Sequence, residues 1–336
     1  MTLRPARLVL YFVLTAFGAT AAAAEPPVKA EIVAVTKIWD EAPHNAFTDL
    51  VRFKDQWYCA FREGEAHVSP RGKLRVIRST DGQSWESAGL LAHDDYDLRD
   101  ACLSETPDGR LMLLGGAQQA SEGRHPTGTV VSFSKDGASW TAPKLVLPLP
   151  KWLWRITWHG DKAYGIAYGG EAGEHFSLQT TGDGINFEEI VADSPAPSGG
   201  GWLTEARIRF DAEGTAYCLQ RRDGKQNSAL LGIAAPPYRS WHWKDLGLYF
   251  GGPNFIKVPT GHWIGAGRII DKTAHTDVTW LDAENGAMHS LLTLPSGGDC
   301  SYPGMVWHDG LLWISYYSSH EGKANIYLAK VRLTAK

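Results

Sequence analysis

The chain has 336 residues, a formal net charge of −4 and 21% charged residues, which is enough for one large domain or two ordinary ones. No run of Lys and Arg suggests a nucleic-acid backbone as a ligand, so we expect no nucleic-acid partner. The 36 Gly and 14 Trp are typical of an all-β protein with many tight turns and aromatic side chains around a cleft.

The first 24 residues have the pattern of a secretory signal peptide. Arg4 and Arg7 precede the apolar run Leu8–Phe17, and the alanines 21–24 precede Glu25. The run is short for a membrane-spanning helix, although an uncleaved membrane anchor is the alternative. We therefore expect cleavage after residue 24, a single mature domain over residues 25–336, and a periplasmic or secreted protein with no further membrane attachment.

Export would allow disulfide bonds among the four cysteines, Cys59, Cys102, Cys218 and Cys300. Buried free thiols are an equally good interpretation. The cysteine spacing matches no zinc-binding pattern, and no other group of metal ligands stands out. We expect no metal ion and no cofactor.

A strand predicted over Glu31–Ile38 is followed by an internal repeat of about fifty residues. Each repeat has a short apolar strand, a tight turn and a second apolar strand. The six copies are Thr48–Phe61, Asp100–Gly115, Arg155–Tyr168, Glu205–Leu219, Asn254–Gly267 and Tyr302–Tyr316. A period of this length predicts a six-bladed β-propeller with four-stranded antiparallel blades. The strand at Glu31–Ile38 could pair with Asn325–Leu333 in the last blade and so close the ring.

A second repeat lies between these hairpins. Ser79–Trp85 reads STDGQSW, Ser134–Trp140 reads SKDGASW, and Thr181–Phe187 is a weaker copy, TGDGINF. The Asp can accept backbone N–H groups of its own turn, and the Gly can take a positive φ, so we interpret these turns as devices of the fold. One acid per copy disfavours calcium binding. The motifs resemble the Asp-boxes of the sialidase superfamily, whose members are six-bladed propellers; non-enzymatic propellers also carry them.

Three of the second strands end in an arginine at the same register, Arg62, Arg221 and Arg268. In a propeller these ends face one mouth of the ring. Guanidinium groups are suited to bidentate binding of a carboxylate. Three of them together favour an anion site over arginines that are paired with local carboxylates.

Sialidases bind the carboxylate of their substrate with three arginines and use a tyrosine nucleophile assisted by a glutamate. The resemblance implies that Tyr302 and Glu205 are this pair and that Arg221 and Arg268 are two of the arginines. The stretch 301–310 is similar to the segment that follows the family's tyrosine. A free phenol has a pKa of about 10, so this chemistry needs a base within hydrogen-bond reach.

The first half of the chain departs from the sialidase pattern. The place of the family's first arginine reads Phe47-Thr48-Asp49, so Arg62 could substitute for it. The loop that holds the family's acid/base Asp contains no Asp here and offers Glu63, Glu65 and His67. Asp49 and Asp100 are the candidate proton donors, with Asp49 slightly favoured.

Further candidate contacts to a sugar lie close to the starts of the inner strands. They are the tryptophans Trp152, Trp154 and Trp202 and the basic residues Arg99, Arg155 and His125. The residues 198–201 read as a rim loop.

The sequence thus favours an exo-acting glycoside hydrolase that releases a terminal sialic acid or a related 2-keto sugar acid from a glycan or glycoconjugate. Two alternatives stay open. One is a propeller glycosidase that acts on a uronic or neutral sugar with paired carboxylates such as Asp49 and Glu205. The other is a carbohydrate-binding propeller without catalysis. The sequence carries no signal of oligomeric state.

Overall fold

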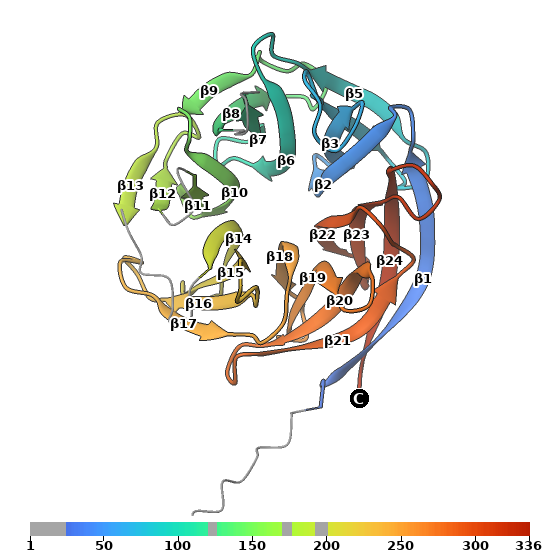
Figure 1. Cartoon of the computed structure of the whole chain (residues 1–336), viewed down its shortest axis with the longest axis vertical. Helices are drawn as coiled ribbons and strands as arrows, with labels where there is room; N and C mark the ends of the chain where they lie inside the picture. Colours follow the sequence, from blue (N-terminus) through green and yellow to red (C-terminus); the bar gives the residue numbers. More distant parts are fainter. Residues whose placement is uncertain (1–24, 120–125, 170–176, 192–200) are drawn as a thin grey trace, which may run out of the picture.

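Six antiparallel sheets of four strands each stand around a central axis (Figure 1), which confirms the predicted propeller. The computed structural model describes residues 25–119, 126–169, 177–191 and 201–336. The predicted signal peptide, His125 and residues 198–200 lie outside this part of the chain. No residue of the described part is helical, so no helix there could cross a membrane.

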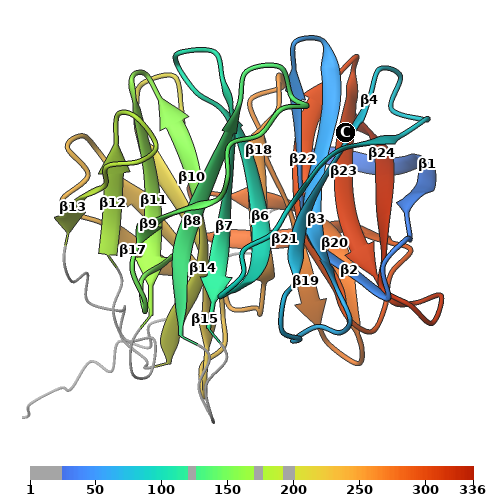
Figure 2. The ribbon, with the colours of Figure 1, turned by 90° about the horizontal axis from the view of Figure 1, so that it is seen from above.

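Five of the blades are continuous in sequence, each running from an innermost to an outermost strand. Blade I contains β2 (His44–Phe53), β3 (Gln56–Gly64), β4 (Lys73–Ser79) and β5 (Glu86–Leu91); blade II contains β6 (Asp97–Glu105), β7 (Leu111–Gln118), β8 (Thr127–Ser134) and β9 (Lys144–Leu147); blade III contains β10 (Trp152–His159), β11 (Lys162–Tyr168), β12 (Ser177–Thr181) and β13 (Glu188–Val191); blade IV contains β14 (Trp202–Phe210), β15 (Ala216–Asp223), β16 (Leu230–Ala234) and β17 (His242–Asp245); blade V contains β18 (Gly251–Lys257), β19 (Trp263–Ile270), β20 (Ala274–Asp282) and β21 (Ala287–Leu294). The strands run roughly along the axis, so the connections gather at the two ends of the ring (Figure 2).

Blade VI is built from both ends of the described chain. Its strands are β22 (Cys300–His308), β23 (Leu311–Ser318), β24 (Asn325–Ala335) and, at the outer edge, β1 (Val28–Trp39). β1 pairs with β24 along its length, from Val28 opposite Ala335 to Trp39 opposite Ile326. This pairing confirms the predicted closure of the ring.

The apolar core fills the spaces between neighbouring blades. One cluster joins Tyr58 and Leu74 of blade I to Leu98 and Leu113 of blade II. Middle strands are therefore covered on both faces, and every residue of β7 and β8 is buried. All four cysteines are buried and free, so the interpretation as unpaired thiols holds.

The three Asp-Gly turns share one set of hydrogen bonds. In the first, Asp81 Oδ1 accepts the backbone N–H groups of Gln83 and Ser84 at 2.8 and 2.9 Å. The Oγ of Ser79 accepts the N–H of Gly82, whose φ is +68°. The turns at 136 and 183 repeat these bonds. The motif thus stabilises the turn between the third and fourth strands of a blade.

Every innermost strand carries a β-bulge at the same height. In the six blades the bulge falls at residues 47–48, 100–101, 154–155, 204–205, 252–253 and 302–303 of the innermost strand. Four residues at the first bulge position have a positive φ: Phe47 at 62°, Asp100 at 53°, Gly252 at 58° and Tyr302 at 52°. Bulges re-aim side chains and are frequent beside active sites, and positive φ is strained for residues other than glycine.

The positions of the bulges show that the six repeats, as aligned from the sequence, do not start at equivalent residues. Asp100 and Tyr302 are equivalent, but Asp49 and Asn254 lie two residues beyond the equivalent position in their own blades. Because side chains alternate between faces along a strand and the bulge interrupts that alternation, equal spacing in sequence does not give equal direction. Phe47 and Gly252 occupy the equivalent positions instead.

Candidate active site

The centre of the site is a hydrogen bond between Tyr302 of β22 and Glu205 of β14. The Tyr302 hydroxyl donates to Glu205 Oε1, and both residues are 6% exposed. Arg221, near the end of β15, donates from Nη1 to the same oxygen at 2.8 Å and to the phenol oxygen at 3.2 Å. The backbone N–H of Gly252 binds Glu205 Oε2 at 2.8 Å. Strands from blades IV, V and VI therefore fix this pair.

The surroundings of Tyr302 and Glu205 favour a protonated phenol and an ionised carboxylate. Burial raises the pKa of the Tyr302 phenol well above its ordinary value, and the neighbouring Glu205 carboxylate raises it further. Burial works against an ionised Glu205, but the charge of Arg221 and the hydrogen bond from Tyr302 lower the pKa of this carboxyl below its ordinary value. The result is a neutral phenol that donates to an ionised carboxylate, which is the state needed for a nucleophile with its own base.

Aromatic rings hold the Tyr302 side chain in place. The rings of Phe47, Trp154 and Tyr317 have centroids 5.1, 5.8 and 5.9 Å from that of Tyr302. On another side, Gly252 leaves room for the ring, because a Cβ there would lie 2.7 Å from Tyr302 Cδ2. The orientation of the phenol is therefore set by packing as well as by its hydrogen bond.

Arg268 of β19 also lies against Tyr302. Its Cζ atom is 5.5 Å from the centroid of the phenol ring. It donates from Nε to the backbone oxygen of Cys300 at 2.9 Å, and from Nη2 to Tyr317 at 2.9 Å and Asp299 at 3.3 Å. The structure thus brings Arg221 and Arg268 together with Glu205 and Tyr302, four residues that the sequence had singled out.

Arg62, expected as the third arginine of the site, has a different place. It is 0% exposed, and its Nε donates to Asp97 Oδ1 at 3.0 Å. Nη1 binds the backbone oxygen of Ala66 at 2.8 Å, and Nη2 binds Ser69 through both its backbone oxygen and Oγ. The loop between β3 and β4 folds back over the guanidinium and uses its donors, so Arg62 holds this loop and offers nothing to an anion.

Asp49 and Arg155 lie in a buried network between blades, which corrects the expectation of catalysis by Asp49 and of substrate binding by Arg155. Arg155 Nη1 contacts Asp49 Oδ1 at 3.1 Å, and the N–H of Leu103 donates to Asp49 Oδ2 at 2.9 Å. Arg155 also binds the backbone oxygens of Thr48 and Pro303. With Asp49 3% and Arg155 2% exposed, these residues tie the inner strands of four blades together.

Asp100 and Arg99 do border the site. Asp100 Oδ1 accepts from Trp154 Nε1 at 3.3 Å, and Oδ2 accepts from Arg99 Nε at 3.2 Å. Burial raises the pKa of the Asp100 carboxyl, Arg99 opposes the rise and Glu205 adds to it. Arg99 also lies 5.0 Å from the centroid of the Phe47 ring. Of the two carboxyls that the sequence offered as proton donors, Asp100 is the one beside Tyr302.

Comparison with known proteins gives matches in three dimensions alone. No family profile and no curated protein matches the sequence. A protein of unknown function from Dyadobacter fermentans has a TM-score of 0.79 at 19% identity, over 92% of this chain and 100% of that one. The α-L-arabinofuranosidase Arb93A of Fusarium graminearum reaches 0.71 at 13%, over 90% and 98%. NanB sialidase from Streptococcus pneumoniae reaches 0.67 at 9%, over 91% and 70%. The chain therefore shares the six-bladed propeller fold of these proteins.

Within this propeller the tryptophans expected at the rim separate into two groups. Trp154 is fully buried under the site, where it positions Asp100 and Tyr302 and presents no face to a sugar. Trp152 stacks on Tyr168 with centroids 5.3 Å apart. Trp202 is 44% exposed and packs against Gly224, so it remains available as a surface for a sugar ring.

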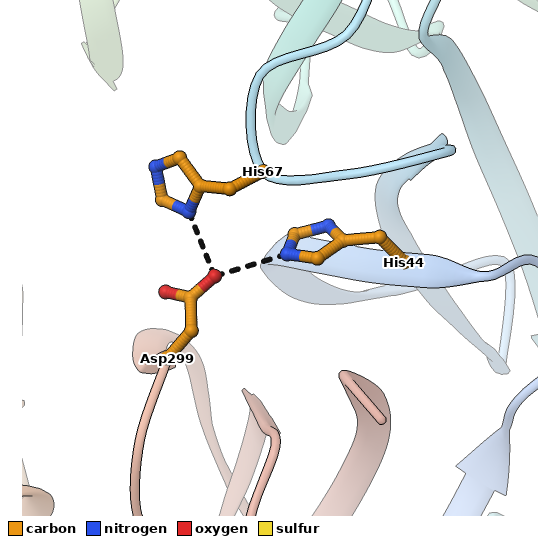
Figure 3. A group of neighbouring side chains, drawn as sticks. All are labelled: His44, His67 and Asp299. Carbon is orange, nitrogen blue, oxygen red and sulfur yellow. Dashed lines mark hydrogen bonds and ion pairs between the residues drawn. The ribbon is translucent and has the colours of Figure 1, made fainter. Parts of the chain in front are cut away.

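The propeller also assembles a cluster that the sequence analysis missed. His44 of β2, His67 of the loop after β3 and Asp299, just before β22, meet at the end of blades I and VI (Figure 3). Asp299 Oδ2 lies 2.9 Å from His44 Nε2 and 2.7 Å from His67 Nδ1. No motif links these residues, since 232 positions separate His67 from Asp299. Two histidines and one carboxylate are also the ligand types of several metal sites.

Proposed function

We propose that the protein is an exo-acting glycoside hydrolase in which Tyr302 is the nucleophile and Glu205 is its base. The observation that carries the proposal is the buried hydrogen bond from a neutral phenol to an ionised carboxylate, with Arg221 in contact with both. The glycosidases among the structural neighbours support the same reaction class. Since residues 1–24 resemble a signal peptide, we propose that the enzyme acts on glycans outside the cytoplasm.

In the proposed reaction the phenol oxygen of Tyr302 attacks the anomeric carbon of the terminal sugar. Glu205 accepts the phenol proton as the new bond forms, and the bond to the leaving oxygen breaks. Water then attacks the same carbon and displaces Tyr302, which recovers its proton from Glu205. A neutral phenol is favourable where the anomeric carbon bears a carboxylate, because an ionised nucleophile would be repelled.

The proposed substrate is a terminal acidic sugar, sialic acid or a related 2-keto sugar acid. Three guanidinium groups support this choice. Arg221 and Arg268 contact Tyr302, and Arg99 lies over Phe47, so Arg99 takes the part expected of Arg62. Arginine is the side chain best suited to a planar carboxylate.

A neutral sugar is the second candidate, favoured by the local charge balance. Each of these arginines already has a carboxylate partner: Arg221 pairs with Glu205 and Asp223, Arg268 with Asp299, and Arg99 with Asp100. An arabinofuranosidase is among the structural neighbours. In this case Asp100 and Glu205 would form the carboxylate pair, in place of Asp49 and Glu205.

The test is a screen of the purified protein against aryl glycosides of sialic, uronic and neutral sugars, with Tyr302→Phe and Glu205→Gln alongside. We expect turnover of the acidic glycosides that both substitutions abolish. Turnover of neutral glycosides alone supports the second candidate. Binding without turnover of any glycoside, unchanged in Tyr302→Phe, identifies a carbohydrate-binding propeller and overturns the proposal.

A further inference from the structure

The loop between β3 and β4 is held over the site by two arginines. Arg62 binds the backbone oxygens of Ala66 and Ser69 from below, and Arg99 reaches the backbone oxygen of His67 at 3.5 Å. Ser69 Oγ also accepts the N–H of Glu65. His67, between these anchors, therefore has a defined position although its side chain is 47% exposed.

The imidazole of His67 has one fixed nitrogen and one open nitrogen. Nδ1 lies 2.7 Å from Asp299 Oδ2, and an ionised carboxylate only accepts, so Nδ1 carries the hydrogen. Nε2 points away from the carboxylate (Figure 3), and no hydrogen bond to another described residue uses it. A histidine held through Nδ1 by a carboxylate presents Nε2 for proton transfer, as in serine hydrolases.

Asp299 is built to support such an imidazole. Its Oδ1 accepts from Tyr317 at 2.6 Å and from Arg268 at 3.3 Å, and its Oδ2 accepts from both histidines. Burial works against ionisation, but the hydrogen bonds from His44 and His67 lower the pKa of the Asp299 carboxyl far below its ordinary value. The Asp299 carboxylate therefore lies against the ring of His67 and fixes the orientation of the imidazole.

His67 is one aromatic ring away from the nucleophile. Its ring meets Phe47 edge-on at 5.1 Å, and Phe47 meets Tyr302 at the same centroid distance. A cavity of about 250 Å³ opens beside the same loop. It is lined by Val68, Ser69, Pro70, Arg71, Asp94, Asp95, Tyr96, Asp97 and Gln118. Val68, the residue after His67, is part of this lining.

We propose that His67, oriented by Asp299, is the acid/base of this enzyme and that the leaving group departs into the cavity beside its loop. The inference rests on the proposed glycosidase function and adds the proton donor to it. His67 donates the Nε2 proton to the leaving oxygen as the glycosidic bond breaks. It then takes a proton from the water that attacks the anomeric carbon, which returns the imidazole to its starting state.

Asp100 is the competing donor. Both of its oxygens accept hydrogen bonds, from Arg99 and Trp154. We assign it to positioning, because Arg99 and Trp154 already engage both of its oxygens. The His-His-Asp set would also suit a metal ion, so the experiment must separate proton transfer from metal binding.

The experiment compares two glycosides of the same sugar in the full-length mature protein: an alkyl glycoside, whose leaving oxygen needs a proton, and a dinitrophenyl glycoside, whose leaving oxygen does not. In His67→Ala we expect kcat/KM for the alkyl glycoside to fall by about 10²- to 10⁴-fold. The dinitrophenyl glycoside should lose far less, and added imidazole should restore part of the alkyl rate. His308→Ala, at a hairpin outside the site, is the matched control and should change neither rate.

The outcomes separate the two proposals. If the wild-type protein cleaves neither glycoside, the glycosidase function fails and the assignment fails with it. If the wild type cleaves both and His67→Ala slows both equally, the assignment alone is wrong. The assignment of His67 is also wrong if Asp100→Asn, and not His67→Ala, slows the alkyl glycoside more than the dinitrophenyl glycoside. Activity that EDTA removes and Zn²⁺ restores would make the cluster a metal site and overturn the proton-transfer role.

Discussion

Tyr302 donates its phenol hydrogen to Glu205 although the two residues are 97 positions apart and lie on different blades. Neither residue could hold the other alone, because the contact exists only when blades IV and VI meet at the axis. Arg221 contacts both groups and sets the charge of the pair. We therefore expect the proposed activity to depend on this three-residue unit.

Substitution of either Tyr302 or Glu205 should lower kcat/KM almost as much as substitution of both. We expect Tyr302→Phe and Glu205→Gln each to lower kcat/KM by about 10²- to 10⁴-fold, since each removes nucleophile activation. Because the residues act as one unit, the double variant should be no slower than the slower single variant. Steady-state kinetics of the four proteins tests this. Additive losses would show that the two residues act separately.

The acid limb of the pH–rate profile should report Glu205. Its pKa is below the ordinary value, so its basic form persists into acidic solution. In Arg221→Gln the opposing charge is gone and burial raises the pKa of Glu205, so the acid limb of kcat/KM should move to higher pH. Arg268→Gln is the control, because Arg268 makes no hydrogen bond to Glu205. A shift of equal size in both variants would contradict the assignment of the base.

Gly252 should be required for activity because of its missing side chain. A Cβ at this position would lie 2.7 Å from Tyr302 Cδ2, so Gly252→Ala should displace the phenol and reduce kcat strongly. Gly310 also has a positive φ, but a Cβ there meets nothing within 4 Å. Both substitutions carry the backbone strain of about 1–2 kcal/mol, measured as a lower melting temperature. If Gly252→Ala and Gly310→Ala lose activity equally, contact of the new Cβ with Tyr302 is not the cause of the loss.

Asp49→Asn should affect stability and leave catalysis intact. Asp49 and Arg155 form a buried ion pair, and loss of one charge leaves the other uncompensated, which costs about 3–5 kcal/mol. Denaturant unfolding measures this loss, and kcat of the folded fraction should match the wild type. A stable Asp49→Asn protein without activity would restore Asp49 as the acid.

The Asp-Gly turns should contribute to stability at neutral pH and lose this contribution in acid. For Asp183, partial burial is outweighed by the backbone N–H groups of Asn186 and Ile185, which lower the pKa to about 2. A carboxyl with a depressed pKa in the folded state stabilises the fold above its unfolded pKa of about 3.9. The difference in melting temperature between wild type and Asp183→Asn should therefore shrink as the pH falls from 4 towards 2. A constant difference would show that the charge is not involved.

The sequence predicted those features that follow from periodicity and from residue type. The repeat gave six blades and the closing strand. The predicted common register of Arg221 with Arg62 and Arg268 is wrong by one residue, because Arg222 holds that register and Arg221 lies opposite the bulge. Arg221 and Arg268 nevertheless both contact Tyr302. Arg62 has the register of Arg268 but does not contact Tyr302, because the loop after it folds back and uses its donors. The position of an arginine in its strand predicts the side to which it points, but the neighbouring loop determines its hydrogen-bond partners.

The bulges explain the remaining differences. A bulge adds one residue to each inner strand, and at this bulge Phe47 has the position expected for Asp49, while Asp49 pairs with Arg155 in the buried network between blades. Such bulges depend on strained backbone angles that carry no fixed sequence signature. His44, His67 and Asp299 could not be grouped from the sequence either, since their contact requires blade I to lie beside blade VI.

The pairing of β1 with β24 has a consequence for assembly in the cell. Until residues 325–335 have been made, the first strand has no partner and the ring stays open. If the chain crosses a membrane before it folds, β1 and β24 would remain unpaired strands at the two ends of an open propeller. Their pairing would be the last step of folding. Tyr302 and Glu205, split between blades VI and IV, would meet only when the ring closes, so an unfinished chain would lack the proposed catalytic pair.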